Sequence, residues 1–303
     1  MNKIFFVTIL SSCFYFCNLS YAKDKIKIVA TLTTYADIAK TVGGNRVQVS
    51  HIAPPTFDPH HITPKPSDVM KLKRADLFIH GGLDLEVWRE PLLNAVGKSR
   101  IRSGGDRNLS LSQEIKILEI PDHQINRSDG DIHLNGNPHF WISPENGKII
   151  AKTIFSKLVA IDRSHEMIYK NNLDRFTAKI DKLIVKWKYK FKQYRGLEII
   201  AYHNQWIYLT DFLGIKVNVF IEPKPGIHPS TKHILYLQSY IKSNKVKGII
   251  QSSFMPKKIS EKISIKSDVK VALLCQNVGE NSEVITYLSM QEYNFKHLYD
   301  LLK

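Results

Sequence analysis

From residue 25 onward, short runs of apolar residues alternate with segments in which apolar residues recur at every third or fourth position. Short β-branched runs, such as residues 26–31, are typical of buried strands, whereas apolar residues at every third or fourth position, as in residues 35–44, predict helices. Strands that alternate with helices indicate parallel sheets with helical cover. We expect strands at 26–31, 46–52, 75–82, 197–203, 215–226 (ending in a proline-rich loop), 246–253 and 269–274. We expect helices at 35–44, 66–75, 85–97, 144–160, 164–194, 205–214, 231–243, 256–267 and 282–302.

One amphipathic stretch, residues 164–194, is much longer than the others. Its apolar residues recur mostly at spacings of three to five, and they are Ile168, Leu173, Phe176, Ile180, Leu183, Ile184, Trp187 and Phe191. This pattern predicts a helix of about 30 residues, roughly 45 Å long, and a soluble helix of that length often joins two lobes. The sequence therefore predicts an α/β fold with two α/β lobes, each built on a mainly parallel sheet, joined by one long rigid helix. The expected parts are an N-terminal lobe at 23–163, a bridging helix at 164–195 and a C-terminal lobe at 196–303.

The first 22 residues have the pattern of a secretory signal peptide. Lys3 supplies a positive start, residues 4–17 form an apolar run, and the small residues around Ala22 form a cleavage site. We expect export to the periplasm with cleavage after Ala22, and lipid anchoring at Cys13 is the weaker alternative. Of the three cysteines only Cys275 lies outside this segment, so no internal disulfide is expected.

The composition is basic, with 43 lysines and arginines, 28 aspartates and glutamates, and a formal net charge of +15. The basic residues are scattered along the sequence. The segment 186–192, KWKYKFK, is interpreted as a helix whose apolar residues pack while its lysines face water. We therefore expect no nucleic-acid partner, and a non-specific affinity for an anionic membrane surface is consistent with the charge. We also expect the protein to be a monomer.

Three histidines occupy similar positions in the predicted fold. His60 follows the expected strand 46–52, His139 follows a polar loop at 121–138, and His203 ends a strand. His60 and His139 each stand directly behind a proline, which stiffens the backbone. In open α/β sheets, ligands bind outside the carboxyl ends of the strands. Two lobes that face each other at these ends would enclose all three imidazoles, and such a cluster favours a metal site.

Short motifs surround these histidines in a fixed order along the chain. They are Asp58-Pro59-His60, Pro64-Lys65-Pro66-Ser67-Asp68, the segment 82–88 (GLDLEVW), Asn137-Pro138-His139-Phe140-Trp141, Pro144-Glu145-Asn146 and the segment 203–208 (HNQWIY). These motifs resemble those of a known family, the zinc- and manganese-binding substrate-binding proteins of bacterial ABC transporters, called cluster A-I or cluster 9. The resemblance covers essentially the whole chain after the signal, in the same order.

The resemblance implies a metal-binding protein that is not an enzyme. It implies that His60, His139 and His203 hold a metal ion in the cleft between the lobes, and that a membrane permease powered by an ATPase receives the ion. Zn²⁺ is the expected ion and Mn²⁺ the weaker alternative, because His203 stands where manganese-binding members usually carry glutamate. Imidazoles release protons near pH 6.5 when they bind a metal, so we expect affinity to fall in mild acid.

The fourth ligand is the point where this chain departs from the family. Members usually supply an aspartate, but alignment on Val278-Gly279 places Gln276 at that position. The sequence leaves four candidates open, namely Gln276, Glu222, His228 and water.

Two further histidines, His123 and His133, lie in the polar loop. Some zinc-specific relatives carry a histidine- and acid-rich loop there that is thought to collect metal, but this loop has only two histidines and we interpret it as solvated. A secreted zinc hydrolase with a three-histidine site is an alternative function, although no HExxH motif is present. A surface adhesin of the same family is another.

Overall fold

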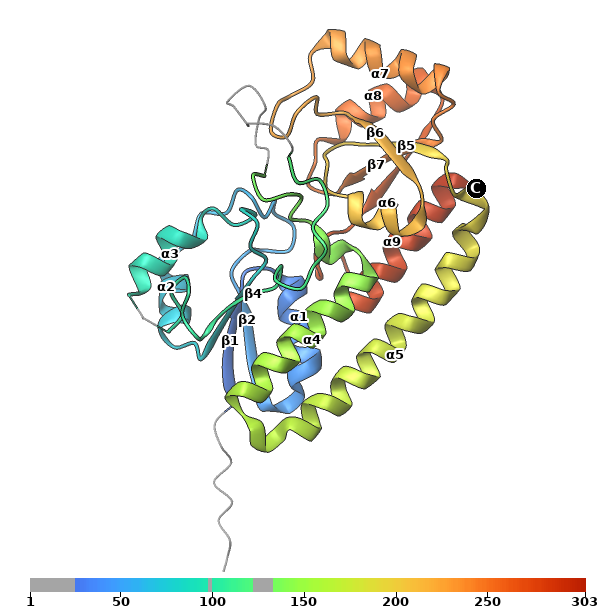
Figure 1. Ribbon diagram of the computed structural model, residues 1–303. Helices are drawn as coiled ribbons and strands as arrows, with labels where there is room; N and C mark the ends of the chain where they lie inside the picture. The colour runs from blue at the N-terminus through green and yellow to red at the C-terminus, as the bar shows by residue number, and fades with distance from the viewer. Residues whose placement is uncertain (1–24, 98–99, 122–132) are drawn as a thin grey trace, which may run out of the picture.

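The computed structural model describes residues 25–97, 100–121 and 133–303, and it contains two four-stranded parallel sheets (Figure 1). The first sheet has the order β2-β1-β3-β4 and the second the order β6-β5-β7-β8. The strands are β1 (Ile26–Ala30), β2 (Val47–His51), β3 (Leu77–His80), β4 (Asn108–Ser110), β5 (Glu198–Ala201), β6 (Lys216–Phe220), β7 (Gly248–Ser252) and β8 (Lys270–Leu274). The expectation of two α/β lobes with parallel sheets is confirmed. The short strand β4 was not predicted, because a segment of three residues shows no periodicity.

Helices cover both faces of each sheet (Figure 1). They are α1 (Thr33–Gly43), α2 (Pro66–Lys73), α3 (Arg89–Val96), α4 (Pro144–Ile161), α5 (Glu166–Phe191), α6 (Ile207–Leu213), α7 (Thr231–Ser243), α8 (Lys257–Ser267) and α9 (Tyr287–Leu302). In the first lobe, α2 and α3 pack on one face of the sheet, and α1 and α4 lie on the other. In the second lobe, α7 and α8 cover the outer face. The domain boundaries expected at 163/164 and 195/196 stay a prediction.

The long helix α5 runs along both lobes, as its apolar periodicity predicted (Figure 1). It spans 26 residues, and short 3-10 turns extend it on both sides over 163–165 and 192–194. The ring of Trp187 stacks on Phe295 of α9 at 5.5 Å between centroids, whereas Tyr189 is 81% exposed. The prediction for KWKYKFK is therefore confirmed for Trp187 and Phe191, which are buried, and for the exposed lysines, but it is wrong for Tyr189. Ile168 is 39% exposed, so it does not belong to the buried face to which its spacing assigned it.

One hydrophobic core extends across both lobes. Side chains of α1, α4, α5 and α9 belong to the same buried cluster, together with residues of both sheets. The final helix begins at Tyr287 rather than near residue 282, because Thr286 caps it by accepting a hydrogen bond from the Ser289 backbone N–H. No helix in the described ranges is long and apolar enough to cross a membrane.

Candidate metal centre

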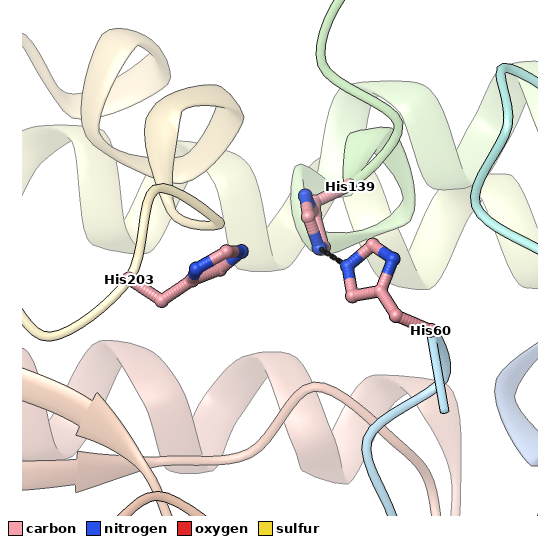
Figure 2. Close-up of side chains that lie close together, drawn as sticks. All are labelled: His60, His139 and His203. Carbon is pink, nitrogen blue, oxygen red and sulfur yellow. Dashed lines mark hydrogen bonds between the residues drawn. The ribbon is translucent and has the colours of Figure 1, made fainter. Parts of the chain in front are cut away.

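The three predicted histidines lie together between the lobes (Figure 2). His60 follows β2, His139 directly precedes a 3-10 turn at Phe140–Ile142, and His203 lies two residues past β5. One ring nitrogen of each lies within 4.8 Å of the corresponding nitrogens of the other two. The Nε2 atoms of His60 and His139 are 3.1 Å apart. The structure thus brings together imidazoles that are 79 and 64 positions apart in the chain.

Hydrogen bonds from neighbouring side-chain and backbone groups hold the His60 loop in place. The indole Nε1 of Trp88 donates a hydrogen bond of 2.9 Å to the Pro59 carbonyl, and the His60 backbone N–H donates to Asp58 Oδ1 at 3.0 Å. The backbone of Leu85 forms a hydrogen bond with the His60 ring. Two of these contacts come from the segment 82–88, which explains why that motif accompanies the histidine.

Glu86 fixes the segment 82–88 itself. Its buried carboxylate accepts hydrogen bonds from Thr31 Oγ1 at 2.7 Å and from the Gly81 backbone N–H at 2.8 Å. The segment needs this support because Gly82, Leu83 and Asp84 all have positive φ angles, of 82°, 56° and 62°. Leucine rarely adopts this conformation, so surrounding contacts must stabilise the turn.

Asn137 orients the ring of His139, which is only 1% exposed. The ring Nδ1 lies 3.0 Å from Asn137 Oδ1, which also accepts from the His139 backbone N–H. The amide of Asn137 donates in turn to Glu119 Oε2 and to the Asn204 carbonyl, both at 2.9 Å. Because Nδ1 donates to Asn137, Nε2 carries the lone pair that faces the other histidines.

Glu222 orients His203 in the same way. Its Oε2 lies 2.8 Å from His203 Nδ1, so the carboxylate stands behind the ring and leaves Nε2 free to face the cleft. Strand pairing brings this contact about, because Ala201 of β5 pairs with Phe220 of β6 and both functional residues follow two positions later. Glu222 was an open candidate for the fourth ligand, and its position instead fits an outer partner of His203.

Replacing Glu222 with glutamine is expected to weaken metal binding by about 10–100-fold, as is typical of outer-shell partners. A neutral amide accepts a weaker hydrogen bond from Nδ1 and makes Nε2 less basic. Calorimetric titration would measure the change, with Glu261→Gln on the outer side of α8 as a charge-matched control. Equal affinities for the two variants would contradict this role for Glu222.

The remaining predicted residues occupy different places around the cleft. His228 is exposed and lines a cavity of about 700 Å³ whose wall also includes His60 and His203. Gln276 is 1% exposed, and its Oε1 has no hydrogen-bond partner within residues 25–97, 100–121 and 133–303. His123 lies outside the described residues.

His133 does not behave as the sequence interpretation assumed. Its ring stacks on that of His60 at 4.9 Å between centroids and lies 6.0 Å from the ring of His139. The end of the polar loop therefore lies against the histidine cluster instead of in solvent. The sequence offered one signal for this position, since only five residues separate His133 from His139. Asn137 lies in a motif that the sequence analysis names, but its role behind the His139 ring was not predicted. Glu119 was missed because a carboxylate that contacts such a partner carries no motif.

Burial determines the protonation of two of the three rings. Together with a smaller effect of the neighbouring imidazoles, it lowers the pKa of His60 to about 3 and the pKa of His139 well below the ordinary histidine value. Both rings are therefore neutral between about pH 5 and 7, with lone pairs available to a metal. The expected loss of affinity in mild acid does not follow for these rings, because they carry no proton that a metal must displace.

The metal-free protein is expected to lose stability as the pH falls below about 6.5. Unfolding frees His60 and His139 to bind protons at ordinary pKa values, so the unfolded state gains protons that the folded state excludes. Each ring contributes at most about 1.4 kcal/mol per pH unit, down to its folded pKa. Urea unfolding at stepped pH would measure the decline, and His60→Asn should make it shallower. A constant free energy of unfolding from about pH 6.5 to 4 would contradict this prediction.

Comparisons with known proteins identify the family of this chain. The family model for the periplasmic zinc-uptake complex component A, ZnuA, matches residues 28–301. The manganese ABC transporter substrate-binding lipoprotein PsaA of Streptococcus anginosus is 26% identical over 276 residues, which cover 89% of this chain and 87% of PsaA. The iron ABC transporter substrate-binding lipoprotein MtsA of Streptococcus pyogenes serotype M1 is 30% identical over 168 residues, which cover 55% of this chain and 52% of MtsA.

A solved structure extends the agreement to the fold. The crystal structure of ZnuA superposes with a TM-score of 0.76 at 23% identity, covering 92% of this chain and 100% of the ZnuA chain. The family model spans both lobes, and the family consists of transport components rather than enzymes. The chain therefore belongs to the zinc-uptake component A family and is a metal-binding substrate-binding protein of an ABC transporter.

Proposed function

We propose that this protein captures Zn²⁺ between its lobes through His60, His139 and His203 and delivers it to a membrane permease. The convergence of three imidazole nitrogens from distant parts of the chain carries this proposal. Nitrogen ligands around a tetrahedral Zn²⁺ lie about 3.4 Å from one another. The nitrogens here lie within 4.8 Å, so only small side-chain movements would complete the site.

The donor set favours zinc over the other ions of the family. Three neutral imidazoles suit Zn²⁺, whereas Mn²⁺ prefers carboxylate oxygen. Relatives named for manganese and iron keep those ions as alternatives. A measured affinity for Zn²⁺ does not by itself identify the transported ion, because Zn²⁺ outcompetes Mn²⁺ and Fe²⁺ at most nitrogen sites.

The metal acquired in cells is therefore the better test of zinc transport. The protein purified from unsupplemented medium should contain zinc as its main metal by mass spectrometry. A strain lacking the protein should grow poorly when zinc is depleted and normally when manganese is depleted. The opposite growth pattern, or manganese as the main copurified metal, would overturn the choice of zinc.

We infer that Gln276 completes the site through its amide oxygen. This oxygen is buried and has no hydrogen-bond partner among the described residues, which is costly unless something else satisfies it. The Gln276 carbonyl accepts a hydrogen bond from Trp141, whose ring packs 5.5 Å from that of His139. A neutral fourth ligand leaves the charge of the ion less compensated than an aspartate does.

Gln276→Asp is expected to tighten Zn²⁺ binding by about tenfold or more, because a carboxylate attracts the dication more strongly than an amide. Competition with a fluorescent zinc chelator would measure the change. Asn277→Asp adds the same charge one residue away and serves as the matched control. If both variants gain affinity equally, the charge acts at a distance and Gln276 is not a ligand.

The cellular setting follows from the same proposal. The protein acts outside the cytoplasm as a monomer, with its signal removed after Ala22. Relatives named as lipoproteins keep anchoring at Cys13 as the alternative. Both residues lie outside the described ranges. We propose two lobes, at 23–163 and 196–303, with a bridging helix at 164–195. In this division the ion would bind between the two lobes.

A further inference from the structure

The outer surface of the second lobe carries a cluster of positive charge, formed by lysines that are spread along the linear sequence. The segment 231–270, which forms α7, β7, α8 and the start of β8, contains nine lysines against two carboxylates. All nine are exposed, and they are Lys232, Lys242, Lys245, Lys247, Lys257, Lys258, Lys262, Lys266 and Lys270. We call the surface formed by these nine lysines, on α7, on α8 and on the neighbouring ends of β7 and β8, the lysine face. The helices α7 and α8 lie at the top of Figure 1, in orange.

The fold keeps these lysines on the outside. Leu237 and Ile241 of α7 and Ile263 of α8 are buried against Ile200 and Ile249 of the sheet. The two helices thus use their apolar sides to cover the outer face of the sheet, and their opposite sides face water. Within the described part of the chain, none of the nine lysines forms an ion pair.

Exposed apolar side chains lie among the lysines. On α7, Leu235 is 57% exposed and Tyr236 is 49% exposed, and on α8 Ile265 is 81% exposed. Ile265 stands between Lys262 and Lys266 in the sequence of one helix. Apolar and aromatic side chains beside lysines are typical of helices that lie on a membrane surface.

We propose that the lysine face binds the surface of an anionic phospholipid bilayer. The segment contains no arginine, the residue that fits a fixed carboxylate or phosphate through two parallel hydrogen bonds. Lysines on flexible stems instead suit a fluid layer of phosphate groups whose positions are not fixed. The binding would hold the exported protein close to the membrane that contains its permease.

Vesicle cosedimentation tests this proposal. The protein used is the one that the producing cell has exported and processed. Wild type should sediment with vesicles of phosphatidylcholine and phosphatidylglycerol in equal parts, and not with phosphatidylcholine alone. The variant Lys258→Glu/Lys262→Glu/Lys266→Glu reverses the charge of three lysines on one side of α8. It should bind the anionic vesicles at least about tenfold more weakly than wild type. The control Lys152→Glu/Lys179→Glu/Lys182→Glu makes the same change of net charge on α4 and α5.

The control variant should bind the vesicles within about twofold of wild type, since its lysines lie outside the lysine face. Equal losses in the two variants would overturn the proposal, because net charge alone would then explain binding. Wild type that binds soluble dextran sulfate but no vesicle would also overturn it in favour of an acidic polymer. Both variants should retain the circular dichroism spectrum and the zinc affinity of wild type, which verifies folding. All variants share the same N-terminus, so a lipid anchor cannot produce the difference.

Discussion

His139→Ala is expected to abolish high-affinity metal binding, with a loss larger than the 10–100-fold that an outer-shell substitution typically causes. The change removes one of three nitrogens from the cluster and leaves Asn137 Oδ1 with one of its two hydrogen bonds to His139. Because the ring is 1% exposed, we also expect a loss of about 1–3 kcal/mol in folding stability. Calorimetric titration with Zn²⁺ and urea unfolding of the metal-free protein would separate the two effects.

His228→Ala is the matched control for this experiment. His228 is exposed and lines the same cavity, but it does not belong to the group of nitrogens within 4.8 Å. We expect its removal to change affinity by less than about twofold. An unchanged affinity in His139→Ala would reject the three-histidine site, and an equal loss in His228→Ala would make His228 the fourth ligand.

Trp141→Ala is expected to lower the free energy of unfolding by about 3–5 kcal/mol and to weaken metal binding at the same time. The indole is fully buried, and its ring packs at 5.7 Å against Tyr35 and at 5.5 Å against His139. Its Nε1 donates a hydrogen bond of 2.7 Å to the Gln276 carbonyl beyond β8. One side chain therefore links the two lobes directly behind the metal centre.

Trp187→Ala serves as the control because it removes another buried tryptophan far from the cleft. Its Nε1 donates to Glu292 Oε2 at 2.8 Å, and its ring packs on Phe295. We expect a similar loss of stability in urea unfolding but an unchanged zinc affinity at temperatures where both variants are folded. If the two variants bind zinc equally well, Trp141 has no specific role in positioning His139.

The spacing of apolar residues predicts most of this fold. The positions of His60, His139 and His203 relative to the predicted strands and loops predict that these three residues lie close together. Strands and helices follow from apolar spacing, and ligands lie beyond the carboxyl ends of strands because parallel topology brings those ends together. The partners of each ring could not be predicted in this way. Glu222 lies behind His203 only because of the register between β5 and β6, and no local pattern encodes that register.

Two other features depend on tertiary structure for the same reason. The low pKa of His60 and that of His139 result from burial by segments distant in sequence, which composition cannot reveal. The lysine face likewise arises because two helices cover the same side of a sheet. In the linear sequence its lysines are spread over 40 residues.

The hydrophobic core shared by both lobes restricts how an ion can leave. Parting the lobes as rigid bodies would expose apolar surface of α1, α5 and α9, at a cost of about 2.5 kcal/mol for every 100 Å². Displacing the short segments that carry His60 and His203 leaves that surface covered. Release of the ion should therefore need a local displacement of these segments rather than a rigid-body opening of the lobes. A permease would need to contact only those segments to release the ion.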